Sequence, residues 1–310
     1  MHCPIKELPQ LSFILSFLFI LLLTNCSQNS KQQNVTDLTQ TEVSLFNTEK
    51  RMFHSEIMNF DFQIYISLPY SYAYTDTTYP VLFNLDANIS FGITDNVVHI
   101  LSTLNKEIPE MVVVGIAYTI KGIEDWAAWR CRDFRPTSHP EKDKAWQDRL
   151  TKASGRDDIV VASGGADKFL AFIREELIPF IESNYRISSD RAISGVSASG
   201  LFTLYTLFQH PETFQRYFAG SPSISWDEPY MYKLEKSLAA SHKDLPVSLF
   251  MCVGGLESES YINNMNKMAE LLRSRKYPNL ELETVIFENE THGSIYQAAI
   301  SRALKMLYSK

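Results

Sequence analysis

Apolar residues alternate with other residues between Phe60 and Leu68, where the chain reads FDFQIYISL. A two-residue period is typical of a strand with one buried face. The preceding stretch RMFHSEIM predicts a partner strand, and we expect the two to form an antiparallel hairpin.

After this hairpin, short apolar runs alternate with longer amphipathic segments. The runs that predict strands are YPVLFNLD, MVVVGIAY, RAISG, RYFAG, VSLFMCVGG and LELETVIF. Helices are expected over residues 91–104, 165–184, 198–209, 230–239, 261–275 and 294–307. Apolar residues in 165–184 follow the i, i+3, i+4 spacing of a helix that faces a core. This alternation predicts an α/β protein with a mostly parallel sheet covered by helices on both faces.

The segment from about 119 to 162 interrupts the alternation, because it is rich in Trp, Arg, Asp and Pro. We expect an irregular insertion that forms the rim of an active site, since long connections in such folds commonly do so. No internal repeat divides the chain, and one domain is expected over residues 42–310.

Composition excludes several classes of protein. The 310 residues are 45% apolar and carry a net charge of −7. No basic stripe of the kind that nucleic acids require is present, so a nucleic-acid partner is not expected. The sequence contains no C-x-x-C pair and no H-E-x-x-H motif, so we predict no metal site. Of the four cysteines, two lie in the first 26 residues, and no disulfide is expected between Cys131 and Cys252.

The first 26 residues differ from the rest of the chain. Thirteen mostly apolar residues, LSFILSFLFILLL, end at Leu23 and precede Cys26. This length suits the core of a signal peptide better than a membrane span. The end of the segment resembles a bacterial lipobox, in which the cysteine becomes lipidated; the alternative is an ordinary cleaved signal with an incidental cysteine. We therefore expect an exported, membrane-anchored lipoprotein facing the periplasm or cell exterior, with residues 27–41 as a flexible tether.

The stretch SGVSASG, residues 194–200, is similar to the nucleophile elbow G-x-S-x-G, although Ser199 occupies the second glycine position. The elbow requires a strand, a sharp turn and a helix, and the flanking residues predict all three. Ser197 is thus the candidate nucleophile. Ser194 lacks small neighbours on both sides, and Ser199 would lie within the helix. We expect the extra hydroxymethyl group of Ser199 to strain the turn without preventing the elbow from forming.

A nucleophilic serine needs a histidine base and an acid that orients it, in the chain order Ser, acid, His. Of the seven histidines, only His292 lies late enough, in the loop between the last predicted strand and helix. The loop after VSLFMCVGG offers Glu257 and Glu259 as the acid, and Glu257 is preferred because it follows the strand more closely.

An oxyanion needs hydrogen-bond donors in addition to this triad. The backbone N–H of Ala198 is one candidate because it directly follows the nucleophile. The loop after YPVLFNLD supplies Ala87 or Asn88 as the other. No metal or organic cofactor is needed for such chemistry.

Several stretches together resemble the α/β-hydrolase esterase family that includes bacterial siderophore esterases of the enterobactin type. They are YPVLFNLDA, VVVGIAY, RCRDFRPT, SGGADKFLAFIREELIPFIESNYRI, the elbow, FAGSPSISWD, VGGLE and THGS, in the family's order over residues 50–308. The resemblance implies Ser197 as nucleophile, His292 as base and Glu257 as acid. This chain differs from the family at Val196, where histidine is usual, and at Ser199, where glycine is usual.

The expected activity is a serine carboxylic-ester hydrolase that forms an acyl-enzyme and acts on a small-molecule ester. Siderophore trilactones, carbohydrate acyl esters and simple acyl esters remain open as substrates. Arg132 could bind an anionic substrate or pair with Asp133, and Trp226 could wall the pocket or belong to the core. The alternative function is a non-catalytic, hydrolase-like binding lipoprotein, suggested by the unusual residues of the elbow.

Overall fold

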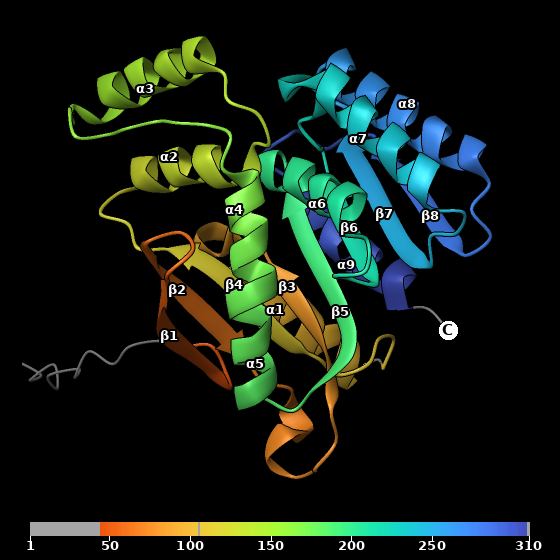
Figure 1. Cartoon of the computed structure of the whole chain (residues 1–310). Coiled ribbons are helices and arrows are strands. Elements are labelled where there is room, and N and C mark those ends of the chain that lie inside the picture. The colour runs from red at the N-terminus through yellow and green to blue at the C-terminus, as the bar shows by residue number, and fades with distance from the viewer. Residues whose placement is uncertain (1–43, 105, 309–310) are drawn as a thin grey trace, which may run out of the picture. The chain divides into compact units, whose positions relative to one another are not determined.

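A computed structural model describes residues 44–104 and 106–308. The predicted signal segment, the tether and Cys26 therefore lie outside the described residues. Eight strands form one sheet in the order β1-β2-β4-β3-β5-β6-β7-β8 (Figure 1). Their bounds are β1 Thr48–Ser55, β2 Phe60–Ser67, β3 Tyr79–Asn84, β4 Val112–Tyr118, β5 Ile187–Val196, β6 Arg216–Gly220, β7 Val247–Gly254 and β8 Leu280–Phe287.

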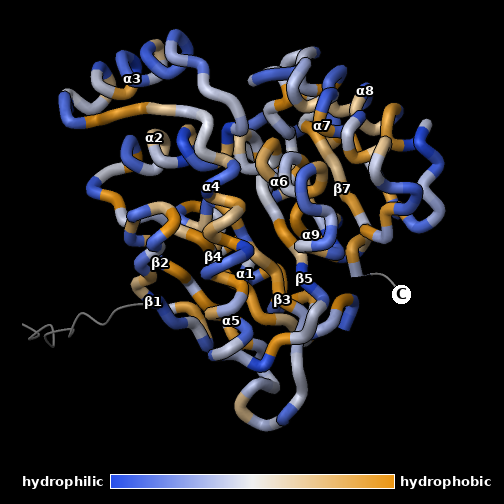
Figure 2. The backbone as a smooth tube through the Cα atoms, viewed as in Figure 1, coloured by the Kyte–Doolittle hydropathy of each residue, from blue (hydrophilic) through white to orange (hydrophobic). Residues whose placement is uncertain are grey.

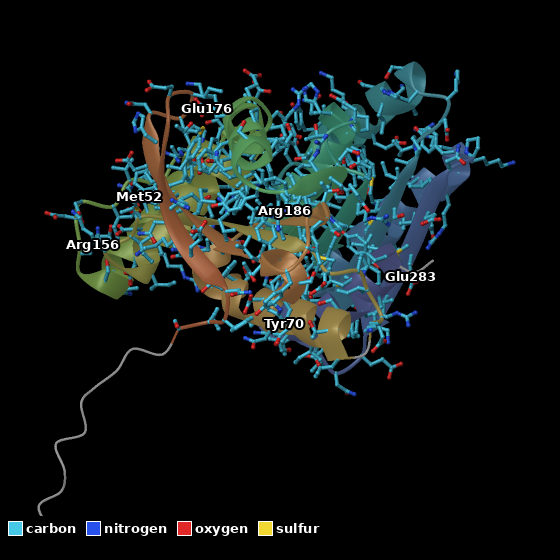
Figure 3. All side chains as sticks on the ribbon, turned by 90° about the horizontal axis from the view of Figure 1, so that it is seen from below. Met52, Tyr70, Arg156, Glu176, Arg186 and Glu283 are labelled. Carbon is cyan, nitrogen blue, oxygen red and sulfur yellow. The ribbon has the colours of Figure 1, made fainter. Side chains whose placement is uncertain are left out.

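The strands β3 to β8 are parallel to one another, whereas β1 and β2 form the predicted antiparallel hairpin. The hairpin joins the sheet because β2 pairs antiparallel with β4. Phe62, Ile64 and Ile66 of β2 are fully buried, as their two-residue spacing predicts. In Figure 3, Met52 on β1 and Glu283 on β8 mark the two opposite edges of the sheet.

Helices cover both faces of the sheet, as expected. On one face, α1 (Ala87–His99) and α9 (Ile295–Tyr308) share a core with β4, β6 and β7. The other face carries α4 (Ala166–Ala171), η3 (Phe172–Leu177), α5 (Ile178–Asn184), α6 (Ala198–Gln209), α7 (Glu228–Ser241) and α8 (Glu259–Arg275). Figure 2 shows apolar residues concentrated in the strands and polar residues on the outer turns of the helices. None of the helices in the described residues is long and apolar enough to cross a membrane.

The predicted irregular insertion is wrong in its secondary structure. Residues 119–162 contain two helices, α2 (Ile123–Phe134) and α3 (Pro140–Ser154). In Figure 1 both helices lie beyond the ends of the central strands. The start and stop signals of α3 are present in the sequence, with a proline at its first position, acidic residues in the first turn and left-handed Gly155 after its end. The apolar stripe that usually identifies a helix is absent, because α3 buries only Asp143 and Leu150.

The first helix also begins earlier than its apolar pattern indicates. It begins at Ala87 instead of residue 91 and continues after His99 as the short π-helical segment η2, Ile100–Leu104. The cause is Asp86, whose left-handed backbone (φ 55°) turns the chain directly from β3 into α1.

Two glycines in helices provide a matched test of close packing at the start of α6. A Cβ on Gly200 would lie 2.5 Å from the carbonyl oxygen of Gly220 in β6, whereas a Cβ on Gly92 in α1 would meet only a Leu45 side-chain atom at 3.8 Å. Gly200→Ala is expected to lower the free energy of unfolding by about 1–3 kcal/mol. Gly92→Ala should instead raise it by up to about 1 kcal/mol, because alanine restricts the unfolded chain. Urea denaturation of both variants measures the contrast, and an unchanged Gly200→Ala midpoint would contradict it.

Candidate active site

The turn between β5 and α6 holds Ser197 in an uncommon backbone conformation. Its φ is 67° and its ψ is −119°, a region that costs a non-glycine residue about 1–3 kcal/mol. The N–H of Ser197 donates to the Gly220 carbonyl at 2.9 Å, which fixes the turn to β6. Gly195 is needed because a Cβ there would lie 2.5 Å from the Ser199 carbonyl oxygen. The strand, turn and helix predicted around Ser197 are all present.

Ser199 is hydrogen-bonded rather than crowded. Its hydroxyl oxygen is buried and accepts from the Val196 N–H at 2.9 Å. It also lies 2.7 Å from the Asp86 carboxylate, to which it donates. Asp86 in turn accepts from the Trp126 indole N–H and from two nitrogens of Arg130, at 2.8–3.0 Å. The expected strain at this position is replaced by a buried polar network beneath the elbow.

His292 is oriented by Glu257. The Nδ1 atom of His292 lies 2.6 Å from a carboxylate oxygen of Glu257, whose side chain is 1% exposed while that of His292 is 41% exposed. The other carboxylate oxygen accepts from the Ser221 hydroxyl at 2.5 Å and from the Gly254 N–H at 2.8 Å. Burial raises the pKa of Glu257, but these hydrogen bonds outweigh it and hold the pKa below its ordinary value. Glu257 is therefore an ionised acid that leaves Nε2 of His292 free.

Ser197 and His292 line one cavity of about 590 Å³. The Ser197 hydroxyl lies 3.4 Å from that of Ser223, which lies 3.2 Å from the Tyr261 hydroxyl. The rings of Tyr261 and His292 are 4.8 Å apart. Within the described residues, no hydrogen bond joins Ser197 to His292 directly. Such bonds are commonly loose in a ligand-free enzyme and tighten when substrate binds.

The structure brings one of the three predicted oxyanion residues to the cavity. Ala198 lines it and is the first residue of α6, so its N–H has no carbonyl partner within the helix. Ala87 and Asn88 are absent from the cavity lining, which is formed after β3 by Leu85 and Asp86. The Asn88 side chain instead accepts from the Tyr118 N–H and donates to the Tyr118 carbonyl, at 2.8 and 3.0 Å, which joins α1 to β4.

Of the three arginines in RCRDFRPT, Arg132 lies away from the cavity, and of its two expected roles the pair with Asp133 is the one present. Arg132 pairs with the fully buried Asp133 and stacks on Phe60 and Trp129. Arg130 and Arg135 both line the cavity instead. Residues two apart on a helix point about 200° from each other, so Arg130 and Arg132 cannot share a face of α2. That periodicity was the available signal for distinguishing them.

Trp226 belongs to a second cavity of about 400 Å³ beside the first. The two cavities share four lining residues, which are Arg135, Trp146, Ser223 and Tyr261. The Trp226 indole donates to the Thr137 carbonyl at 3.1 Å and is mostly buried. Trp226 therefore contributes both to the core and to a cavity wall, as both interpretations of the sequence allowed.

The described residues contain no group of three or more His, Cys, Asp or Glu side chains that could hold a metal ion. Cys131 and Cys252 are both buried with free thiols. Cys131 lines the catalytic cavity, and burial raises its pKa above the ordinary value, which disfavours a thiolate. Ser197, which lines the same cavity, is half-buried.

A serine on a strand–turn–helix elbow shares a cavity with a histidine bonded to a buried carboxylate, at the carboxyl edge of a mostly parallel sheet. These features define the α/β-hydrolase class. Residues 55–293 match the family described as "Putative esterase". The chain belongs to this family and is an esterase.

Relatives named as siderophore esterases are similar to this chain in sequence. The chain is 33% identical over 281 residues to ferri-bacillibactin esterase BesA of Bacillus subtilis (strain 168), covering 86% of this chain and 91% of that protein. It is 49% identical over 175 residues to a siderophore enterobactin esterase of Emericella nidulans, covering 47% of this chain and 57% of the relative. The crystal structure of the BES protein from Bacillus cereus superimposes with a TM-score of 0.75 at 28% identity, covering 89% of this chain and all of that one (100%).

Substitution of Glu257 tests whether it orients His292. Glu257→Gln keeps the shape of the side chain but removes the carboxylate that accepts from Nδ1, so kcat/KM on an ester is expected to fall about 10²–10⁴-fold. Glu259→Gln is the matched control, because Glu259 is an exposed residue at the start of α8, and it should change kcat/KM less than about twofold. Steady-state kinetics near neutral pH, where wild-type Glu257 is ionised, measure both. Equal effects of the two changes would remove Glu257 from the triad.

Proposed function

We propose that the protein hydrolyses siderophore esters through an acyl-enzyme formed on Ser197. The observation that carries this proposal is the single cavity shared by Ser197 and His292, with Glu257 buried behind the histidine. The siderophore substrate is supported by the relatives whose names refer to ferri-bacillibactin and enterobactin. A cavity of about 590 Å³ is within the usual range for a small organic ligand.

In the proposed reaction, His292 Nε2 removes the proton of the Ser197 hydroxyl as its oxygen attacks the ester carbonyl. The proton then passes to the leaving alkoxide, and the acyl group remains on Ser197. A water molecule, deprotonated by His292, releases the acid and restores the serine. Glu257 holds Nδ1 protonated throughout and stabilises the imidazolium that forms in each step.

The negative charge of the tetrahedral intermediate needs donors on the cavity wall. The Ala198 N–H is one. For the second, the Asp86 N–H is a better candidate than those of Ala87 and Asn88. Asp86 lines the cavity, and its N–H donates to no other described residue. The negatively charged carboxylate of Asp86 is held by hydrogen bonds from Trp126 and Arg130, so it need not approach the oxyanion.

Ser197→Ala is expected to lower the hydrolysis of enterobactin and bacillibactin at least about 10³-fold, because the triad acts as a unit. Both compounds are offered iron-free and iron-loaded, and the linear acids are quantified by chromatography. Ser237→Ala, an exposed serine on α7, should retain wild-type turnover. A fluorophosphonate should label the wild type and not Ser197→Ala. Retained turnover in Ser197→Ala would exclude the mechanism, whereas hydrolysis of simple aryl esters alone would exclude only the substrate.

We also propose that the enzyme acts outside the cytoplasm, held at a membrane by lipid on Cys26. The apolar segment that ends at Leu23 supports export, and the polar residues 27–41 are suited to a tether. The several acyl chains of a bacterial lipoprotein would anchor it firmly, whereas one chain binds only marginally.

Cys26→Ser is expected to move the protein from the membrane fraction to the soluble fraction without changing its specific activity. Fractionation followed by immunoblotting measures the distribution. Cys131→Ser, a cysteine in the folded domain, is the control and should leave the wild-type protein's membrane association intact. A Cys26→Ser protein that remains on the membrane would indicate an uncleaved apolar anchor, and a soluble wild type would make Cys26 incidental.

A further inference from the structure

A buried arginine without a carboxylate partner lies beside the catalytic cavity. Arg135 directly follows α2 and is 8% exposed. Its Nη1 atom is buried and makes no hydrogen bond. The described residues also provide no ion pair for Arg135, whereas Arg130 pairs with Asp86 and Arg132 with Asp133. Arg135 remains charged at neutral pH, and an uncompensated buried charge is costly.

Neither Asp143 nor Asp227 forms a hydrogen bond or an ion pair with the Arg135 side chain among the described residues. Asp143 attracts Arg135 electrostatically; its Oδ2 accepts from the N–H and the hydroxyl of Ser163, at 2.9 and 2.8 Å, while its Oδ1 is buried without a hydrogen-bond partner. Asp227 accepts from the Tyr230 N–H and lies 3.6 Å from a nitrogen of His139. Burial lowers the pKa of the Arg135 guanidinium from its ordinary value, and the attraction to Asp143 offsets this only in part.

A second cation lies on the same indole ring. The guanidinium carbon of Arg135 is 3.9 Å from the centre of the Trp226 ring, and the Lys142 ammonium is 4.7 Å from it. The ammonium also donates to the Trp226 carbonyl at 2.7 Å, while the indole N–H donates to Thr137. The ring is thus held by its own hydrogen bond and keeps two like charges at one cavity wall. Such an arrangement is favourable when an anion lies between or beside the cations.

This positive wall is continuous with the nucleophile. The backbone N–H of Ser223 donates to the Ser197 carbonyl at 3.1 Å. The backbone N–H of Trp226 donates to the Ser223 carbonyl at 3.0 Å. The short 3₁₀ helix Ile224–Trp226 therefore joins the two sites. One 3₁₀ turn rises about 6 Å. Arg135 itself lines both cavities, so a ligand on Ser197 can reach it without crossing the core.

We propose that Arg135 and Lys142, on the ring of Trp226, form a subsite that binds a carboxylate group of the ester substrate about one 3₁₀ turn from the bond that Ser197 cleaves. The planar fork of Arg135 matches the two oxygens of a carboxylate. The inference rests on the proposed function for the esterolytic role of Ser197. Opening a cyclic polyester leaves one carboxylate and one hydroxyl on a chain that still contains esters, so this subsite favours the opened chain as the next substrate.

The test compares esters that differ only in charge. The acyl-side pair is the 4-nitrophenyl monoester of terephthalic acid and 4-nitrophenyl 4-carbamoylbenzoate; the alcohol-side pair is 4-carboxyphenyl acetate and 4-carbamoylphenyl acetate. The full-length wild type should favour the carboxylate in at least one pair by about 10–100-fold in kcat/KM, the range of a charge-assisted hydrogen bond. Arg135→Met should abolish this preference, which is measured as the ratio of kcat/KM for the charged and the neutral ester of each pair.

The variants at lysine separate this subsite from general surface charge. Lys142→Met should reduce the preference severalfold. Lys144→Met, on the same helix but with a side chain that is 76% exposed and bonded to Asp148, should leave it unchanged. Arg135→Lys should retain part of the preference, because it keeps the charge without the fork. Thermal unfolding verifies that each variant is folded. If Arg135→Met does not fold, the comparison of Lys142→Met with Lys144→Met decides whether the subsite exists.

The outcomes separate this inference from the proposed function. Neutral and charged esters cleaved equally by the wild type, or a preference that survives Arg135→Met, would overturn the subsite and leave the esterase intact. If the protein cleaves none of the four esters, calorimetric titration compares its affinity for terephthalate with its affinity for neutral terephthalamide. Tighter, Arg135-dependent binding of terephthalate would then support the subsite while removing aryl esters as substrates. Equal binding of the two compounds would overturn it.

Discussion

The active site depends on one sharp turn, at Ser197, where a strand of the parallel sheet becomes a helix without an intervening loop. The positive φ of this serine is strained, and it persists because both sides of the turn are held by close backbone contacts. At Gly195 and Gly200 the neighbouring backbone lies too close for any side chain. The Gly220 carbonyl of β6 accepts a hydrogen bond from the Ser197 N–H. Ser197, the proposed nucleophile, is consequently presented at the carboxyl edge of the sheet, directly before the first residue of α6.

The other catalytic groups reach the same edge because the strands that deliver them run parallel. Glu257 follows β7, and His292 follows β8, so side chains 35 residues apart meet at 2.6 Å. The burial of Glu257 matters as much as its position. Burial is outweighed by hydrogen bonds with His292, Ser221 and the Gly254 N–H, which hold the pKa of the carboxylate below its ordinary value, and an ionised carboxylate fixes the tautomer of the histidine.

Charge compensation distinguishes the two arginines that face the cavity. Arg130 is neutralised by Asp86, whose carboxylate also accepts from the hydroxyl of Ser199. The serine that replaces the usual second glycine of the elbow is therefore one member of a satisfied buried network, and such networks are stabilising only when complete. Arg135 has no equivalent partner among the described residues. Its side chain lines the cavity from the residue that directly follows α2.

Local signals in the sequence were sufficient for the order of strands and helices, for the strand–turn–helix at Ser197 and for the pairing of His292 with Glu257 near it. Alternating and helical periodicities are properties of neighbouring residues, and the chain order of the triad follows from the class of fold. The choice between arginines, the buried role of Ser199 and the helical character of 119–162 depend on contacts between distant segments. Periodicity does not reveal α3, in which Leu150 is the one buried apolar residue, and only tertiary structure decides which buried charge has a partner.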